Sequence, residues 1–456
     1  MAVMTFEEAL IAWLPRQRWF AGKGTPITGV ALAADTTLVD GDPGLRHLIL
    51  SVSQGSSTGT YQVFAGTRAD LPGWLDHARI GPAGQDRTAY DGLHDPELTR
   101  MLLAAMAADQ SIGPLHFTHT PGSQIATGLD SLVLTAEQSN TSLLFGEEAI
   151  LKVFRRPSPG PNPDLEVPAA LARLGSPHVA EPLGWIATTM IGMPTILAVL
   201  STYLRAAVDG WSLAATSVRD LYASGSVRAA EAGGDFAGEA HRLGEATAEV
   251  HRDLTVAFGV DELPASALEE LSAHMRGRLA ETVSAVPELA RYEGRLRAIF
   301  DEVATLDGPL EVQRIHGDYH LGQAMRTHGG WVLLDFEGEP AAPLAERRGR
   351  FPALRDVAGM MRSLDYAARF QLAGHEDAEQ VAAAAQDWVR RNQAAFCAGY
   401  AGAGGPDPAK HAVLVRALTL DKAVYEVLYE ARNRPSWVHI PLGSITDTLE
   451  SGGQDT

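Results

Sequence analysis

The feature that most constrains the fold of this 456-residue chain is a pair of polar clusters within residues 313–340. The first is the HGD triplet at 316–318, with Gln323 five residues after its aspartate; the second is the DFE triplet at 335–337, which follows the apolar run 331–334. Phosphoryl transfer from ATP to a hydroxyl needs a carboxylate that accepts the hydroxyl proton, together with an amide oxygen and a second carboxylate that hold magnesium. Protein-kinase-like folds carry these groups in this order. The spacing therefore predicts a phosphotransferase active site.

Within this segment, each polar side chain has a predicted role. Asp318 is the predicted catalytic base, because an aspartate beside the acceptor hydroxyl orients it and takes its proton late; the alternative is a loop aspartate that caps a helix. Gln323 and Asp335 are predicted Mg²⁺ ligands, since amide and carboxylate oxygens suit this hard cation. Glutamine replaces the usual asparagine, and its extra methylene still allows coordination. His316 is kept as a candidate substrate contact, although holding the loop is the favoured interpretation; His320 fits either role.

Length and composition predict a soluble protein with two or three subdomains. The chain exceeds what one core usually supports, and 45% of its residues are hydrophobic. The formal net charge of −19 argues against general nucleic-acid binding. Apolar runs stay far below the roughly 18 residues of a membrane span, and no signal-peptide pattern is present. Cys397 is the only cysteine, which excludes an intramolecular disulfide. The cytoplasm is the expected compartment.

The order of the predicted elements favours an α+β enzyme with two lobes and an added N-terminal module. Alternating segments predict strands between 27 and 66, and Trp19 with Phe20 is interpreted as packing of the first helix on this sheet. Residues 131–156 predict a hairpin of two or three strands, followed by a Pro-rich loop at 157–164. Helices are expected at 5–15, 95–109, 236–254, 264–283, 286–306, 354–372, 375–401 and 410–432.

The hairpin carries a candidate phosphate-binding site. Lys152 lies on its last strand, AILKVF, and resembles the strand lysine that neutralises ATP phosphates while a helix glutamate fixes it. Glu166 is the nearest suitable glutamate. A lone strand lysine is usually solvated, so the functional interpretation depends on the site downstream. The loop formed by Ser139, Asn140, Thr141 and Ser142 precedes this strand as a phosphate-covering loop would, with hydroxyl and backbone donors in place of glycines.

Near the C-terminus, aromatic and charged residues share one helix. Residues 421–432 read DKAVYEVLYEAR and run into NRPSW. Tyrosine, glutamate, arginine and tryptophan together suit a sugar, because aromatic faces stack on C–H surfaces while charged groups bind hydroxyls. A core helix with surface charges explains this segment equally well, and acidic residues near an acceptor also suit a cationic sugar or an amine.

Several longer motifs resemble the actinobacterial maltokinases, which belong to the aminoglycoside-phosphotransferase/protein-kinase-like superfamily. The resemblance is nearly full length. The motifs that carry it are WLPRQRWFAGKG (13–24), DRTAYDGLHDP (86–96), AEQSNTSLLFGEEAILKVFRR (136–156), GGDFAGEAHRLGEATAEVH (233–251), QRIHGDYHLGQ (313–323), LLDFEGEPAAPLAERR (333–348), RDVAGMMRSLDYAA (355–368) and DKAVYEVLYEARNRPSW (421–437). The fold that it implies is α+β, bilobal and kinase-like, with an N-terminal cap at 1–95, a β-rich nucleotide-binding subdomain at 96–203 and a helical lobe at 204–456.

The resemblance also implies an activity: MgATP-dependent phosphorylation of maltose at its anomeric hydroxyl for α-glucan synthesis. By matching position, the resemblance implies that Asp318 is the base and that Gln323 and Asp335 are the magnesium ligands. It also implies that Lys152 and Glu166 anchor the nucleotide phosphates, with 139–142 as the phosphate loop. Glu430, Arg432 and Trp437 become candidate sugar contacts. A maltosyltransferase is the partner protein that this pathway suggests.

Tyr319 departs from the HGDLH motif usual in the family and bears on the choice of sugar. A related group of actinobacterial enzymes phosphorylates glucosamine at the 6-hydroxyl, and Tyr319 beside the base would narrow the pocket for a monosaccharide. Its side chain equally fits a position facing away, since neighbours of a loop residue alternate in direction. Maltose is the favoured acceptor and glucosamine the alternative. A nucleotide-binding pseudokinase and an aminoglycoside or choline kinase are weaker alternatives.

Overall fold

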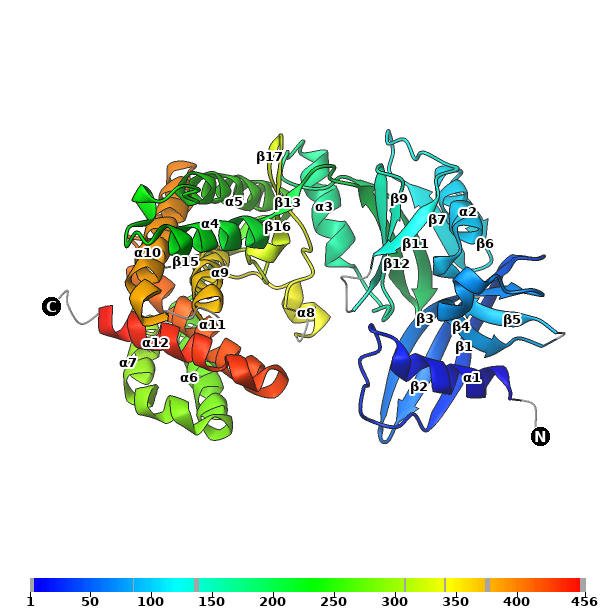
Figure 1. The fold of residues 1–456 in the computed structure, drawn as a ribbon, viewed down its shortest axis with the longest axis horizontal. Helices are drawn as coiled ribbons and strands as arrows, with labels where there is room; N and C mark the ends of the chain where they lie inside the picture. Colours follow the sequence, from blue (N-terminus) through cyan, green and yellow to red (C-terminus); the bar gives the residue numbers. More distant parts are fainter. Residues whose placement is uncertain are drawn as a thin grey trace. The chain divides into compact units, whose positions relative to one another are not determined.

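The computed structural model describes residues 4–84, 86–134, 139–306, 309–339, 342–373 and 378–451. The chain divides into two units, which Figure 1 shows coloured along the sequence. Unit 1 comprises Met1–Ala169 and Ala180–Arg205, and unit 2 comprises Ala170–Val179 and Ala206–Thr456. The helix α3 (Pro163–Arg173) contributes residues to both units.

The first sheet of unit 1 is antiparallel and five-stranded, in the order β1-β2-β3-β5-β4. Its strands are β1 (Gly29–Val39), β2 (Gly44–Gln54), β3 (Ser57–Arg68), β4 (Arg79–Pro82) and β5 (Thr88–Asp91). The helix α1 (Phe6–Trp13) begins at a capping box in which Thr5 and Glu8 bond each other's backbone N–H groups. Trp19 and Phe20 are buried in the core that α1 shares with this sheet, which confirms the interpretation that they pack there.

The second sheet of unit 1 has seven strands, in the order β6-β7-β11-β12-β10-β9-β8. Its strands are β6 (Ser111–Ile112), β7 (Leu115–His119), β8 (Ser131–Leu134), β9 (Thr141–Phe145), β10 (Ala149–Val153), β11 (Pro182–Met190) and β12 (Met193–Thr202). The predicted hairpin is therefore a three-stranded antiparallel piece, β8-β9-β10. The helix α2 (Pro96–Ala107) begins where expected, with Asp95 as N-cap and Pro96 at its first position.

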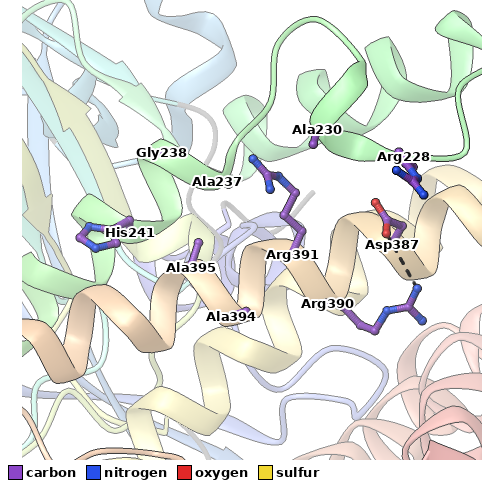
Figure 2. A pocket seen from close by; sticks show the side chains of 10 residues that line it. All are labelled: Arg228, Ala230, Ala237, Gly238, His241, Asp387, Arg390, Arg391, Ala394 and Ala395. Atoms are coloured by element: carbon purple, nitrogen blue, oxygen red, sulfur yellow. Dashed lines mark ion pairs between the residues drawn. The ribbon is translucent and has the colours of Figure 1, made fainter.

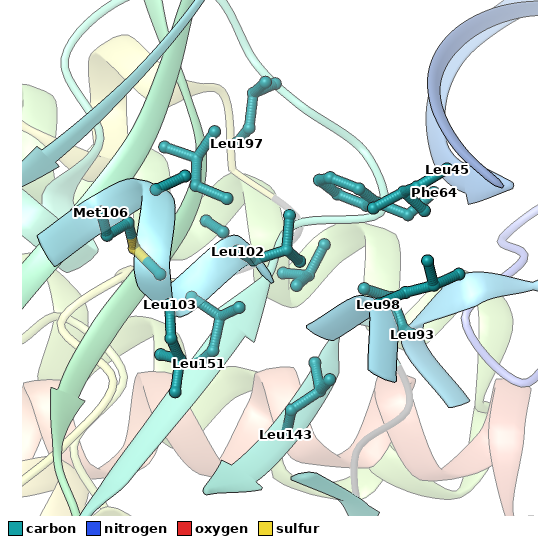
Figure 3. Close-up of a cluster of buried hydrophobic side chains, with 14 of the residues drawn as sticks. Leu45, Phe64, Leu93, Leu98, Leu102, Leu103, Met106, Leu143, Leu151 and Leu197 are labelled. Atoms are coloured by element: carbon teal, nitrogen blue, oxygen red, sulfur yellow. The ribbon is translucent and has the colours of Figure 1, made fainter. Parts of the chain in front are cut away.

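One hydrophobic core joins the two sheets of unit 1. Figure 3 shows Leu45 and Phe64 of β2 and β3 in the same cluster as Leu143, Leu151 and Leu197 of the second sheet. Leucines of α2 complete the cluster. Each fully buried leucine or phenylalanine side chain stabilises the fold by about 1.5–3 kcal/mol relative to an exposed one. The N-terminal sheet consequently derives stability from the second sheet as well as from its own helix.

Unit 2 is mainly helical. Its helices are α4 (Gly210–Ser224), α5 (Ala237–Phe258), α6 (Ala265–Ala285), α7 (Glu293–Val303), α8 (Leu344–Arg347), α9 (Leu354–Ala373), α10 (Ala378–Gly402), α11 (Ala412–Asn433) and α12 (His439–Ser451). Its strands are β13 (Val208–Asp209), β14 (Val260–Leu263), β15 (Leu310–Gln313), β16 (Ala324–Thr327) and β17 (Gly330–Leu333). The two sheets are β13-β16-β17 and β14-β15, and both are antiparallel.

The α+β class is confirmed, and the apolar run 331–334 forms β17 apart from its last residue. Two local predictions are wrong. The helix expected at 286–306 begins only at Glu293, because Pro287 opens a separate 3-10 helix, Pro287–Tyr292. The Pro-rich loop is shorter than predicted, since Pro163 already starts α3, where a missing N–H costs nothing. No helix in the described part of the chain has the length and apolar character needed to cross a bilayer.

Candidate active site

The HGD triplet lies in a loop that follows β15, and its backbone is held by a buried aspartate of α9. Asp356 accepts hydrogen bonds from the backbone N–H groups of His316 at 2.7 Å and of Gly317 at 2.9 Å. Gly317 has a φ of +85°, a left-handed conformation that favours glycine. Together the carboxylate and the glycine fix the turn from which Asp318 projects.

Asp356 is in turn held by His251, which itself bonds Tyr400 on a further helix. Nε2 of His251, on α5, lies 3.0 Å from Asp356 Oδ2, and Nδ1 of His251 lies 2.9 Å from the hydroxyl of Tyr400 on α10. Burial alone would raise the pKa of Asp356, but the hydrogen bond and charge of His251, with the charge of His316 and the Gly317 N–H, lower it below the usual range. The carboxylate therefore stays ionised and able to bind both backbone N–H groups.

His316 connects the HGD loop to the DFE turn. Its Nε2 lies 2.7 Å from the carbonyl oxygen of Leu334, and because a carbonyl can only accept, Nε2 carries the hydrogen. The ring packs between those of Tyr319 and Phe336, at centroid distances of 5.2 and 4.9 Å. His316 is only 2% exposed. This environment suits a side chain that holds the loop, and a role of His316 as a substrate contact stays a prediction.

The side chain of Tyr319 points into the core of unit 2. It is 3% exposed, and its hydroxyl lies 2.8 Å from the Thr247 hydroxyl on α5. Burial raises its pKa far above the ordinary value, so the phenol stays neutral. The sequence left two orientations open for the Tyr319 side chain. In the structure this side chain points away from solvent.

The DFE turn and the 3-10 helix Leu321–Gln323 place the two predicted metal ligands together. Gln323 Nε2 donates to Asp335 Oδ2 at 3.2 Å. Asp335 has a φ of +65°, which is uncommon outside glycine and marks a constrained turn. Glu337 offers a further carboxylate oxygen within 4.8 Å of one on Asp335. These neighbouring oxygen donors fit a magnesium ion. Glu337 was not predicted as a ligand, although its position in the triplet was a usable signal.

Asp318 forms an ion pair with Lys422 of α11, which the sequence analysis missed. Lys422 Nζ lies 3.3 Å from Asp318 Oδ1, and 4.9 Å above the ring of Tyr425 on the next turn. Both partners of the ion pair are partly exposed. The signal was present, because Lys422 is the only lysine in the C-terminal motif at 421–437, but 104 residues separate it from Asp318.

Further along α11, Glu430 lies in a polar and aromatic group. It is 2% exposed, and its Oε1 accepts from the Tyr366 hydroxyl at 3.0 Å and from Arg434 Nη2 at 2.7 Å. The Arg434 guanidinium lies 4.3 Å from the centroid of the Trp437 ring. Two of the predicted sugar contacts, Glu430 and Trp437, are thus joined through Arg434. The third, Arg432, forms an exposed ion pair with Glu281 at 3.0 Å, and its role stays a prediction.

The predicted phosphate-binding residues lie in unit 1. Lys152 Nζ forms an ion pair with Asp164 Oδ2 at 2.5 Å, from the first turn of α3. Glu166 lies two residues further along the same turn of α3. Its pairing with Lys152 stays a prediction. In the β9–β10 pairing, Lys152 is opposite Ser142. Thr141 and Ser142, which were predicted to belong to the phosphate loop, instead begin strand β9, directly across the hairpin from the strand that carries the lysine.

A separate hollow of about 930 Å³ lies on unit 2 and is shown in Figure 2. Its lining combines residues of α5 and α10, with Arg228, Arg390 and Arg391 as its cationic side chains. Arg391 is bound to Asp235 at 2.6 Å, and Arg390 lies 3.9 Å from Asp387. The residues that line it include none of the predicted site residues, so the described structure separates this hollow from the candidate active site.

The HGD loop, the DFE turn and the β-rich unit with its cap define a kinase of the aminoglycoside-phosphotransferase-like class. Comparison with known proteins agrees. Residues 13–95 match the maltokinase N-terminal cap domain family. A glucosamine kinase from Streptacidiphilus jiangxiensis is 32% identical over 422 residues, which cover 89% of this chain and 92% of that protein. One from Mycolicibacterium smegmatis is 30% identical over 332 residues, covering 70% and 79%. The chain belongs to the family of actinobacterial maltokinases and glucosamine kinases.

A solved structure shows the same fold. A glucosamine kinase in complex with glucosamine, ADP and inorganic phosphate superposes with a TM-score of 0.70 at 24% identity, over 98% of this chain and all of that one. A second crystal form of a glucosamine kinase gives a TM-score of 0.69 at 25% identity, covering 95% of this chain and 97% of that one. Nearly the whole chain therefore has a counterpart in a solved kinase structure.

Proposed function

We propose that this sugar kinase transfers the γ-phosphoryl group of ATP to the anomeric hydroxyl of maltose. One grouping of side chains in unit 2 supports the kinase assignment. Asp318 forms an ion pair with Lys422, and His316 of the same loop bonds the carbonyl oxygen of Leu334. Leu334 directly precedes Asp335, which is paired with Gln323. A base, a cation and adjoining oxygen donors are the groups that this chemistry requires.

In the proposed reaction, the acceptor oxygen forms a bond to the γ-phosphorus as the bond from that phosphorus to the β–γ bridging oxygen breaks. Asp318 accepts the hydroxyl proton, and ADP leaves with the bridging oxygen. Lys422, 3.3 Å from Asp318, is placed to neutralise the negative charge of the transferring group. Gln323, Asp335 and Glu337 would hold Mg²⁺, which neutralises phosphate charge when bound. Lys152 and residues 139–142 would bind the nucleotide phosphates.

Maltose is favoured by three observations. The cap of this chain matches the maltokinase cap family over residues 13–95. The C-terminal motif DKAVYEVLYEARNRPSW resembles the maltokinases. The third is Tyr319, the residue that favoured a narrower pocket from the sequence: its side chain is buried, with its hydroxyl 2.8 Å from that of Thr247.

Glucosamine is the second candidate, and the relatives favour it. The two glucosamine kinases that are 30–32% identical to this chain align with it over most of their own length. One solved glucosamine kinase structure contains glucosamine and ADP.

The deciding experiment measures ADP release with maltose, glucosamine and glucose, and identifies the product by ³¹P NMR. We expect the highest kcat/KM with maltose and a product phosphorylated at the anomeric carbon. A hundredfold preference for glucosamine, with phosphate on the 6-oxygen, would overturn maltose as the acceptor and leave the kinase assignment standing. An active parent beside an Asp318→Ala variant that binds nucleotide but releases no ADP would exclude a binding protein without turnover, whereas equal behaviour of the two would support one.

A further inference from the structure

Three of the sequence motifs of unit 1 meet at one buried arginine, Arg155. Arg155 is 0% exposed, and its Nη2 forms an ion pair with Asp91 Oδ2 at 2.5 Å. Its Nε donates to Thr141 Oγ1 at 2.8 Å, and its guanidinium lies 4.6 Å from the centroid of the Trp19 ring. Trp19 and Asp91 belong to the N-terminal cap, whereas Thr141 begins β9 of the second sheet and Arg155 follows its strand β10.

Gln62, on the cap strand β3, makes a second set of buried contacts at the same place. Its Nε2 donates to the carbonyl oxygens of Phe154 at 2.6 Å and of Leu197 at 2.7 Å. Its backbone N–H donates to the carbonyl of Arg155 at 2.9 Å. Because Nε2 uses its two hydrogens in this way, Oε1 is the acceptor, and His47 Nε2 donates to it at 2.8 Å.

These contacts fall on both sides of the predicted phosphate-binding hairpin. Phe154 and Arg155 directly follow β10, which carries Lys152, and Thr141 begins β9 within the predicted phosphate loop. Val153 is opposite Thr141 in the pairing, and Lys152 is opposite Ser142. The cap therefore contacts the chain within three residues of the lysine, and Arg155 connects it to Thr141 of the predicted loop.

We infer that the N-terminal cap positions the nucleotide phosphates: through Gln62, Asp91 and Trp19 it fixes Arg155 and the hairpin that bears Lys152 and residues 139–142. This inference rests on the proposed ATP-dependent function. Its physical basis is that a buried charge or amide which loses one partner is left unsatisfied, so the hairpin has one well-defined arrangement against the cap. Gln62 and Arg155 are positioning residues, since they act through Lys152 and the loop.

The test compares Gln62→Met and Arg155→Lys with Arg68→Lys in the full-length protein. Arg68 is the matched control, because it lies on the same cap strand as Gln62 and forms an ion pair with the buried Asp95 at 2.8 Å. We expect the Kd for MgADP, measured by calorimetry, and the KM for ATP to rise roughly tenfold in the two test variants, since displacement of a binding group by about 1 Å has effects of this size or larger. The KM for the sugar should change less than about twofold, and Arg68→Lys should leave nucleotide binding unchanged.

Equal loss of Tm in all three variants with unchanged MgADP affinity would overturn the inference, because the cluster would then only stabilise the fold. Gln62→Met keeps the experiment decisive if Arg155→Lys fails to fold. A parent protein that binds MgADP but phosphorylates no sugar would overturn the proposed function alone, since the Kd values still measure the effect of the cluster. A parent that binds no nucleotide would overturn both.

Discussion

At the scale of single residues, the ion pair between Asp318 and Lys422 defines the most sensitive position of the proposed site. A lysine 3.3 Å from the proposed base has a direct chemical role available to it in this reaction. In phosphoryl transfer this role is to stabilise the negative charge on the transferring phosphoryl group as it moves toward the acceptor oxygen beside the base. The pair is therefore best explained as part of the reaction centre.

We expect Lys422→Met to lower kcat by at least about a hundredfold with little change in either KM, because removal of one such donor typically costs this much in the transition state. Steady-state kinetics with both substrates varied will measure it. Lys410→Met, at an exposed lysine just before α11, is the control. An unchanged kcat in Lys422→Met would show that the ion pair is structural.

Tyr319 makes a second prediction at the residue scale. Its hydroxyl bonds Thr247 inside the core, so Tyr319→Leu should lower the free energy of unfolding by about 1–2 kcal/mol through the lost hydrogen bond and cavity. The ratio of kcat/KM for maltose to that for glucosamine should stay the same within about twofold, because the side chain is buried and its hydroxyl is held by Thr247. Tyr319→Phe separates the hydroxyl from the ring. A tenfold change in the ratio in either variant would contradict this placement.

At the scale of elements, the sequence predicted local chemistry better than long-range partners. The HGD loop, the DFE turn and the lysine-bearing hairpin were found because their residues are close in sequence and their order reflects one reaction. Asp356, His251 and Lys422 come from α9, α5 and α11, and no local pattern links them to Asp318. Their proximity is produced by the packing of the helices, which spacing along the chain does not encode.

Strands β2 and β3 carry a buried histidine–glutamine pair, His47 and Gln62, in which the titration of the histidine follows from burial. Burial lowers the pKa of His47 to about 4 from 6.5, although the hydrogen bond with Gln62 opposes the change. Between these pH values the unfolded chain binds the additional proton, so this contribution to stability is complete above pH 6.5 and is lost as the pH falls toward 4.

We therefore expect the free energy of unfolding to include a loss of about 2 kcal/mol at His47 between pH 7.5 and pH 5. His47→Gln keeps an N–H donor for Gln62 and removes the titration, so its urea unfolding should be less pH-dependent than that of the parent by this amount. His328→Gln, at an exposed histidine in the β16–β17 turn, should retain the parental pH dependence. Identical pH profiles for the parent and His47→Gln would refute the assignment.

At the scale of the whole molecule, the shared core of unit 1 predicts that the cap and the second sheet unfold together as one cooperative unit. Amide hydrogen exchange on the intact protein tests this prediction. Phe64→Ala should destabilise unit 1 by about 3–5 kcal/mol, since the phenylalanine is fully buried among leucines of both sheets. Amide exchange should then rise together in β1–β5 and in β7–β12, as expected for one unfolding unit. Leu279→Ala, at a buried leucine of α6, is the matched control and should raise exchange in unit 2 while strands of unit 1 stay protected. Faster exchange confined to β1–β5 in Phe64→Ala would show that the cap unfolds by itself, and a cap that opens independently could not hold the hairpin of Lys152 in place for the nucleotide.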